Sequence, residues 1–311
     1  MNKLNYLFLL KLLFSLFVFV SVIACSVRQS SVPTVISTDP PVIVRPRIAI
    51  ALGGGAAKGF AHVGVIRVLE ENGIVADIVT GTSAGSVVGS LYASGLSGVQ
   101  LQAKAVQLDE SNLTDLTLSS RGFIKGERLQ AFINHEVGNR PIEKLTKRFG
   151  AVATELDTGK RITFRAGNTG QAVRASASIP NVFLPVDIKG KHYVDGGLVS
   201  PVPVSAAREM GADFVIAVDI SARPRAGSAK GFLSILDQSL NIMNVVALSH
   251  ELKQADIVIR PQVHHIGPTG FEARHQAMLA GEKAAQACVP VIRKLLEQKT
   301  QQSILARKAV S

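Results

Sequence analysis

The chain has 311 residues, 47% of them hydrophobic and 18% charged, and a formal net charge of +11. This composition excludes a protein that is disordered throughout, and the length allows one large domain or two modest ones. The basic residues are dispersed and have no aromatic residues between them, which disfavours a nucleic-acid-binding protein. They are consistent either with a solvated surface or with attraction to anionic lipid headgroups.

The first 24 residues have the pattern of a secretion signal. Lys3 and Lys11 precede an uncharged apolar run over residues 12–24, which has the length of a signal-peptide core and is short for a bilayer span. A longer apolar segment that starts at Tyr6 and includes Lys11 would instead make an uncleaved membrane anchor. The composition at the end of the run favours the signal.

That run ends in Val22-Ile23-Ala24-Cys25, which resembles the lipobox of bacterial lipoproteins, where the cysteine is lipidated. We therefore expect lipidation of Cys25 and an extended tether over 25–46, which contains four prolines. Ser26 carries no acidic charge, which favours the outer membrane of a bacterial envelope, with the domain on the periplasmic side. The other cysteine, Cys288, is expected to be a small core residue, so neither a disulfide nor a cysteine metal site is predicted.

Strand and helix signals alternate from residue 47 to residue 300. Strands are predicted over 47–52, 76–80, 149–156, 161–165, 182–188, 192–194, 214–220 and 257–260, and helices over 57–71, 84–95, 127–137 and 272–298. Pro290 is expected to bend or interrupt the last helix. The alternation predicts one α/β domain over 47–300 with a mainly parallel sheet flanked by helices, followed by a tail over 301–311. Apolar lid residues are expected within 98–150.

The segment Gly81-Thr-Ser83-Ala-Gly85 matches the pattern G-x-S-x-G between a predicted strand and a predicted helix. In that setting the serine lies on a sharp turn with its hydroxyl exposed above the sheet. The start of the following helix favours developing negative charge. The pentapeptide alone is a weak signal, but its position favours a nucleophilic serine over a glycine-rich turn.

The segment Gly53–Gly59, with sequence GGGAAKG, follows the first predicted strand. Its unobstructed backbone amides can hold a phosphate or an oxyanion. The phosphate-binding patterns fail on spacing, because Lys58 precedes Gly59 with no Ser or Thr after it, and G-x-G-x-x-G would need a third glycine at position 58. A looser pattern through Gly59 remains, but Asp77 is badly placed to bind a ribose. An oxyanion loop is favoured, in which Lys58 fixes the loop, attracts an anionic headgroup or is simply solvated.

A serine nucleophile needs a base, and the sequence offers several candidates. None of the seven histidines lies in a compelling setting, although a triad with one of them stays open. His192-Tyr-Val-Asp195-Gly196-Gly197 is a stronger candidate, because a strand delivers Asp195 onto two glycines. Taken alone, an Asp-Gly pair is most often a turn.

The motifs GGGAAKG, GTSAG and DGG, in this order in an α/β chain, resemble those of the patatin-like phospholipase family. Ala175–Pro180 and Thr154–Gly159 also look like segments of that family, and Ala280-Gly-Glu282 does so more weakly. The resemblance covers about residues 47–210. It implies a three-layer patatin-like fold with a mainly parallel central sheet.

The resemblance also implies a Ser–Asp dyad, with Ser83 as the nucleophile and Asp195 as the base. The backbone amides of Gly54, Gly55 and Ala56 would form the oxyanion hole, and no cofactor or metal would be required. The other residues of the three motifs are Gly53, Lys58, Gly59, Gly81, Gly85, Gly196 and Gly197.

The sequence therefore predicts a lipid acyl hydrolase that cleaves phospholipid or lysophospholipid esters at a membrane. Two alternatives stay open. The first is a lipid-binding or scaffolding lipoprotein with a vestigial site, and the second is an esterase or thioesterase for other substrates.

Overall fold

The computed structural model describes residues 45–108, 115–117, 122–221 and 242–308, together with 231, 235, 238 and 239. The predicted signal, Cys25 and nearly all of the tether lie outside the described residues, so the predictions for them stay predictions. The described residues belong to one compact unit that runs from Ile43 to Ser311.

Among the described residues, eight strands form one mixed sheet in the order β5-β6-β3-β2-β1-β7-β8, with β4 also paired to β3. The strands from β3 to β8 in this order are parallel, whereas β4, β5 and β6 pair antiparallel. The bounds are β1 Ile48–Leu52, β2 Ile78–Thr82, β3 Arg148–Glu155, β4 Arg161–Phe164, β5 Val186–Ile188, β6 Lys191–Asp195, β7 Phe214–Val218 and β8 Ile257–Ile259.

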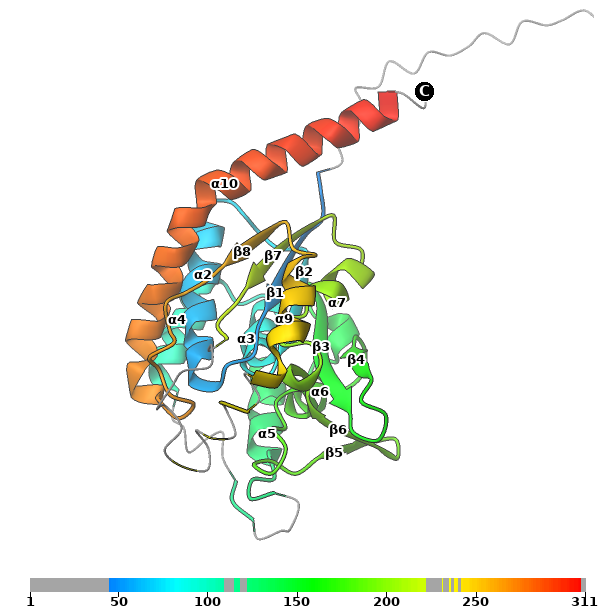
Figure 1. The fold of residues 1–311 in the computed structure, drawn as a ribbon, viewed down its shortest axis with the longest axis vertical. Helices are drawn as coiled ribbons and strands as arrows, with labels where there is room; N and C mark the ends of the chain where they lie inside the picture. The colour runs from blue at the N-terminus through cyan, green and yellow to red at the C-terminus, as the bar shows by residue number, and fades with distance from the viewer. Residues whose placement is uncertain are drawn as a thin grey trace, which may run out of the picture. The chain divides into compact units, whose positions relative to one another are not determined.

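Helices cover both faces of the sheet (Figure 1). The α-helices are α2 Phe60–Glu71, α3 Ala84–Ala93, α4 Gly98–Gln107, α5 Glu127–Glu136, α6 Thr169–Ser176, α7 Val204–Glu209, α9 Val245–Leu252 and α10 Arg274–Lys308. Short 3-10 helices are η1 Ala56–Gly59, η3 Ile142–Lys144, η4 Gly196–Leu198 and η5 Phe271–Ala273. The predicted α/β class, with a mainly parallel sheet flanked by helices, is confirmed.

The central strand β1 shows why both faces are covered. Every residue of its sequence IAIAL is buried, as expected for a parallel strand between two helical layers. Ile48, Ile50 and Leu52 belong to the core that includes α2, α3 and α4, whereas Ala49 and Ala51 pack toward α7 and α9. The larger side chains therefore face α2, α3 and α4, and the alanines let the short helix α7 approach closely.

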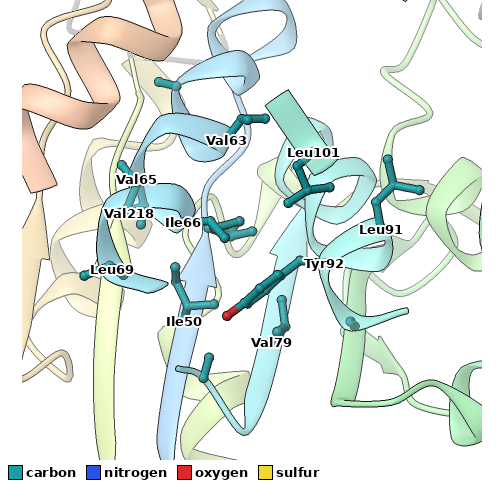
Figure 2. Close-up of a cluster of buried hydrophobic side chains, with 14 of the residues drawn as sticks. Ile50, Val63, Val65, Ile66, Leu69, Val79, Leu91, Tyr92, Leu101 and Val218 are labelled. Atoms are coloured by element: carbon teal, nitrogen blue, oxygen red, sulfur yellow. The ribbon is translucent and has the colours of Figure 1, made fainter. Parts of the chain in front are cut away.

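Figure 2 shows the core on the first of these faces, where side chains of α2, α3 and α4 meet the sheet. Ile50 and Val79 project from neighbouring strands toward Ile66 of α2 and Tyr92 of α3, and all four are buried. This cluster fixes α2 and α3 on the sheet, and those two helices begin at the two glycine-containing motifs.

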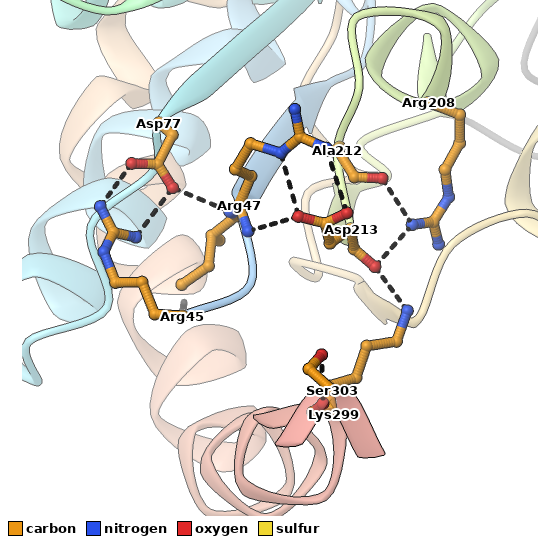
Figure 3. Close-up of polar contacts among 9 residues, drawn as sticks. Arg45, Arg47, Asp77, Arg208, Ala212, Asp213, Lys299 and Ser303 are labelled. Atoms are coloured by element: carbon orange, nitrogen blue, oxygen red, sulfur yellow. Dashed lines mark hydrogen bonds and ion pairs between the residues drawn. The ribbon is translucent and has the colours of Figure 1, made fainter. Parts of the chain in front are cut away.

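Ion pairs join neighbouring segments at the amino-terminal edge of the parallel strands, the edge opposite the two glycine-containing motifs (Figure 3). Arg45 donates to the Asp77 carboxylate at 2.9 Å, and the same carboxylate accepts from the amide of Ile48. Arg47 donates to Asp213 through its backbone amide and its guanidinium. Asp77 thus binds the residues that lead into β1, and it lies at the edge of the sheet away from the glycine loops.

Two predicted elements differ from the structure. Within the predicted strand 182–188 only β5 is a strand, because the Val182 carbonyl accepts from the amides of Phe123 and Ile124 instead. The last helix runs unbroken through Pro290 and continues to Lys308, beyond the predicted start of a tail. It changes direction along its length, as Figure 1 shows.

Among the helices that the structure describes, none combines the length and the hydrophobicity that a bilayer span requires.

Helices α2 and α10 pack at glycines, one on each helix. A Cβ atom on Gly64 would lie 2.0 Å from the carbonyl oxygen of Met278, and one on Gly281 would lie 2.0 Å from that of Ala61. The two backbones therefore approach more closely than any other residue type allows.

Replacing Gly64 or Gly281 with alanine is expected to lower the free energy of unfolding by about 1–3 kcal/mol, because the helices must separate to admit the methyl group. Urea denaturation measures the change. Gly267→Ala is the matched control, since a Cβ there meets nothing within 4 Å, and it should stay within about 0.5 kcal/mol of wild type. Equal effects at all three glycines would contradict the close approach of α2 and α10.

Candidate active site

The three motifs meet because of strand register. β1 runs into Gly53, and β2 runs into Ser83. Thr82, the last residue of β2, pairs with Val152, while Asp195, the last residue of the antiparallel β6, pairs with the adjacent Ala153. The sheet therefore brings a residue from late in the chain next to the turn that carries Ser83.

Ser83 lies on a strained turn between β2 and α3. Its φ of 53° and ψ of −124° place it in a region that side chains rarely adopt. The amides of Ser86 and Val87 in α3 donate to its carbonyl, and its own amide donates to the Ser176 hydroxyl at 3.0 Å. The Ser176 hydroxyl in turn donates to the Val152 carbonyl at 2.6 Å. These bonds hold the turn in its strained form.

Gly81 and Gly85 are required by close packing. A Cβ on Gly81 would lie 2.3 Å from the Gly85 carbonyl oxygen, and a Cβ on Gly85 would lie 2.1 Å from that of Leu52. A Cβ on Gly59 would lie 2.7 Å from the Cβ of Ala84. The glycines on both sides of Ser83 therefore let α3 start directly above the ends of β1 and β2.

Asp195 lies within hydrogen-bonding reach of Ser83. Its carboxylate is 6% exposed and accepts hydrogen bonds from the Ser83 hydroxyl and from the amide of Gly197, the latter at 2.7 Å. Burial raises the pKa of Asp195 from 3.8 to about 6, although both hydrogen bonds oppose the rise. Gly196 packs against the Val152 carbonyl, where no side chain would fit.

The glycine loop offers two amides rather than the three that were predicted. The Gly53 amide donates to Val218, and the Gly54 amide donates to the Pro201 carbonyl at 2.9 Å, so Gly54 is already engaged. Within the described residues, the amides of Gly55 and Ala56 make no hydrogen bond. Ala56 has a φ of 49°, a left-handed conformation that costs an alanine free energy. The loop thus leaves two adjacent amides for an anion.

Two buried polar side chains support this loop. The His62 Nε2 lies 2.8 Å from the Gly53 carbonyl oxygen, and burial lowers the pKa of this histidine to about 4 despite that bond. His62 is therefore the neutral donor of that bond at pH 7. Lys58 is only 2% exposed, so the interpretation of it as an ordinary solvated lysine is wrong.

Two pockets open on the site. The smaller one, of about 350 Å³, includes Ser83, Gly55 and Ala56 and has a mainly apolar wall that includes Val87, Leu91, Leu101, Leu129, Phe132 and Phe271. The larger one, of about 750 Å³, includes Asp195 and Gly55 and carries the charged side chains Lys58, Asp219, Lys253 and Arg260. Part of the region 98–150, where a lid was expected, lines the smaller pocket, and residues 109–114 and 118–121 lie outside the described part.

The structure separates the candidate bases. No histidine lines either pocket among the described residues, whereas Asp195 contacts Ser83 directly. Ser176, Asp219 and Arg260 were not predicted as site residues. Ser176 lies inside the segment Ala175–Pro180, which was noted only for its resemblance, and the two charged residues end strands whose neighbours the sequence did not identify.

Comparison with known proteins decides the family. A family model described as patatin-like phospholipase matches residues 50–208. The chain belongs to the patatin-like phospholipase family. An uncharacterised NTE family protein of Mycobacterium bovis is 37% identical over 187 residues, which cover 60% of this chain and 52% of that protein. Lysophospholipase NTE1 of Coccidioides immitis is 34% identical over 181 residues, which cover 56% of this chain and 12% of that one.

The patatin fold is also seen in a solved structure, VipD from Legionella pneumophila. It aligns with a TM-score of 0.58 and 14% identity over 80% of this chain and 67% of that one. The similarity is one of fold, and it confirms the predicted patatin-like architecture. This patatin-like chain spans about half the length, or less, of the curated relatives named above.

The buried Asp195 should make the stability of this patatin-like domain depend on pH. Its folded-state pKa of about 6 lies above the ordinary value of 3.8. The folded protein therefore retains the proton more readily, and ionised Asp195 costs about 3 kcal/mol above pH 6 and nothing below pH 3.8.

We expect the free energy of unfolding of wild type, relative to that of Asp195→Asn, to fall by up to about 3 kcal/mol between pH 4 and pH 8. Urea denaturation of both proteins across this range measures it. A difference that is constant with pH would show that Asp195 titrates as it does in water.

Proposed function

We propose that this protein is a lipid acyl hydrolase that cleaves the carboxylic ester of a phospholipid or lysophospholipid through Ser83 and Asp195. One observation carries the proposal: the Ser83 hydroxyl is hydrogen-bonded to a buried carboxylate where an apolar pocket meets a charged one. Membership of a phospholipase family supports a lipid hydrolase activity.

The first half of the reaction forms an acyl-enzyme. Ser83 Oγ attacks the ester carbonyl carbon while Asp195 accepts the hydroxyl proton. The carbonyl oxygen gains negative charge, and the amides of Gly55 and Ala56 donate to it. The start of α3 adds a favourable dipole. The C–O bond to the alcohol then breaks, and the leaving oxygen takes the proton from Asp195.

The second half consumes water. Asp195 accepts a proton from a water molecule as that water attacks the acyl carbon, and Ser83 leaves with the returned proton. The raised pKa of Asp195 suits this role, because at pH 7 the carboxylate is still largely ionised and yet is a stronger base than an ordinary aspartate.

The apolar pocket favours a fatty acyl chain over a short one. Its lining residues come from α2, α3, α4 and α5, and Ser83 lies among them. A short acyl group would leave this surface in contact with water, whereas a long chain buries it. A scaffolding protein with a vestigial site would need neither the strained serine nor the unengaged amides.

Ser83→Ala should reduce fatty acid release from lysophosphatidylcholine by at least about 10⁴-fold, because no other group can form the acyl-enzyme. Ser90→Ala is the control, since Ser90 is a buried serine of α3, the helix that follows Ser83, and its hydroxyl donates to the Val87 carbonyl. Release should persist in the control. Equal release by wild type and Ser83→Ala would remove Ser83 from the mechanism.

We also propose that the protein is anchored to the bacterial cell envelope through lipidated Cys25, with the outer membrane and its periplasmic side favoured. The apolar run that ends in Val22-Ile23-Ala24-Cys25 supports this. Anchoring would hold the domain beside its lipid substrate and raise the effective substrate concentration.

The intact mass of the membrane-extracted protein tests the anchor. We expect a chain that lacks residues 1–24 and carries added lipid on Cys25. Cys25→Ala should leave the membrane fraction or retain its leader. An unmodified mature chain would contradict lipidation.

A further inference from the structure

The chemistry of the site assigns each half of the substrate to one pocket. This step rests on the proposed function. The leaving alcohol must receive its proton from Asp195, so it must lie on the Asp195 side of the scissile bond. Asp195 lines the larger pocket and Ser83 the smaller one, and Gly55 lies between them in both. The acyl chain therefore enters the apolar pocket, and the alcohol portion enters the larger pocket, whose lining combines apolar residues with the charged side chains of Lys58, Asp219, Lys253 and Arg260.

Two neighbouring strands place a charged pair in that larger pocket. β7 and β8 are parallel, with Val218 paired to Ile259, so the residues that follow them emerge together. Asp219 follows β7 and Arg260 follows β8, and the Asp219 amide donates to the Ile259 carbonyl at 3.0 Å. β7 also pairs with β1, which leads into the oxyanion loop. The pair therefore lies at the carboxyl edge of the sheet, where open α/β sheets bind ligands.

Asp219 contacts the Arg260 guanidinium at Nε and leaves the two Nη groups available. The Arg260 Nε lies 3.4 Å from Asp219 Oδ2, and the other carboxylate oxygen accepts from the Ser221 amide at 3.0 Å. Asp219 is 10% exposed, whereas Arg260 is 51% exposed. Within the described residues, the two Nη groups of Arg260 have no hydrogen-bond partner. A guanidinium held at Nε presents these two groups as a fork that suits a phosphate.

The charge of the pocket is positive. Lys58, Lys253 and Arg260 line it against the carboxylates of Asp195 and Asp219. When Asp195 holds the Ser83 proton, Asp219 is the one other carboxyl group among the described residues that line this pocket. An anionic group is therefore favoured while the alcohol is still bound.

We propose that Arg260, oriented by Asp219 and assisted by Lys253, binds the phosphate of the substrate's alcohol portion. The substrate is then an ester whose alcohol is a glycerophosphate, with one acyl chain in the apolar pocket. Arg260 determines specificity, because it separates phosphate-bearing lipids from neutral glycerides that carry the same acyl chain.

A pair of substrates with the same acyl chain tests this. Fatty acid release is measured from palmitoyl lysophosphatidylglycerol and from monopalmitoylglycerol, and the ratio of their kcat/KM values is compared between proteins. Arg260→Gln should lower this ratio roughly 10- to 100-fold, because it removes a charge-assisted hydrogen bond to phosphate. Arg260→Lys should give an intermediate ratio, since it keeps the charge and loses the fork.

Arg148→Gln is the matched control. Arg148 is an exposed arginine at the start of β3, at the opposite edge of the sheet from the site, and its replacement should leave the ratio unchanged. An unchanged ratio in Arg260→Gln, or an equal loss on both substrates, would overturn the proposal.

A binding measurement separates this proposal from the proposed function. Isothermal titration of the Ser83→Ala protein with sn-glycerol 3-phosphate should show saturable binding that weakens roughly 10-fold or more when Arg260→Gln is added. Absence of binding would overturn the phosphate site even if wild type hydrolyses lipids. Binding that depends on Arg260 would support the site even if wild type released no fatty acid.

Inorganic phosphate is titrated in parallel. If its binding depends on Arg260 while the substrate ratio does not, the site holds a free anion and the headgroup assignment is overturned.

Discussion

The burial of one carboxylate against one hydroxyl is the constraint on which the rest of the site depends. Within the described part of the chain, the Asp195 carboxylate accepts two hydrogen bonds, from Ser83 and Gly197, and the residue is almost inaccessible to water. Burial destabilises its charged form and so makes it a better proton acceptor. The fold can retain so unfavourable a group because Asp195 ends a strand that is paired within the sheet. Stability and chemistry therefore oppose each other at this position.

The sheet also separates two environments at the site. On one side of Gly55, the helices α2, α3, α4 and α5 supply an apolar wall next to Ser83. On the other side, Asp219 after β7, Arg260 after β8 and Lys253 after α9 supply charged groups to the pocket that Asp195 lines. A lipid ester has the same division, with a hydrocarbon chain on one side of the ester bond and a polar alcohol on the other. Ser83 and Asp195 lie where the two environments meet.

Local patterns could predict the parts of the site that each depend on one short segment. Ser83 and the loop at Gly53–Gly59 follow strands directly, and a strand that runs into a glycine-containing turn is a pattern of neighbouring residues. Pairing Asp195 with Ser83 required the resemblance to a family, because strand order depends on contacts between distant segments. Asp219 and Arg260 could not be predicted as site residues for the same reason, because their strands were predicted without the order of the strands in the sheet. The engaged amide of Gly54 depends on Pro201, which no local pattern connects to that loop.

If Ser83 owes its reactivity to Asp195, the rate of covalent labelling at Ser83 must depend on pH. The rate at which a fluorophosphonate labels Ser83 should rise with pH, with a single midpoint near 6, and should level off above pH 7. In Asp195→Asn the rate should be lower throughout and should lose that midpoint. A wild-type rate that does not change between pH 5 and pH 8, or a midpoint that survives in Asp195→Asn, would contradict the account.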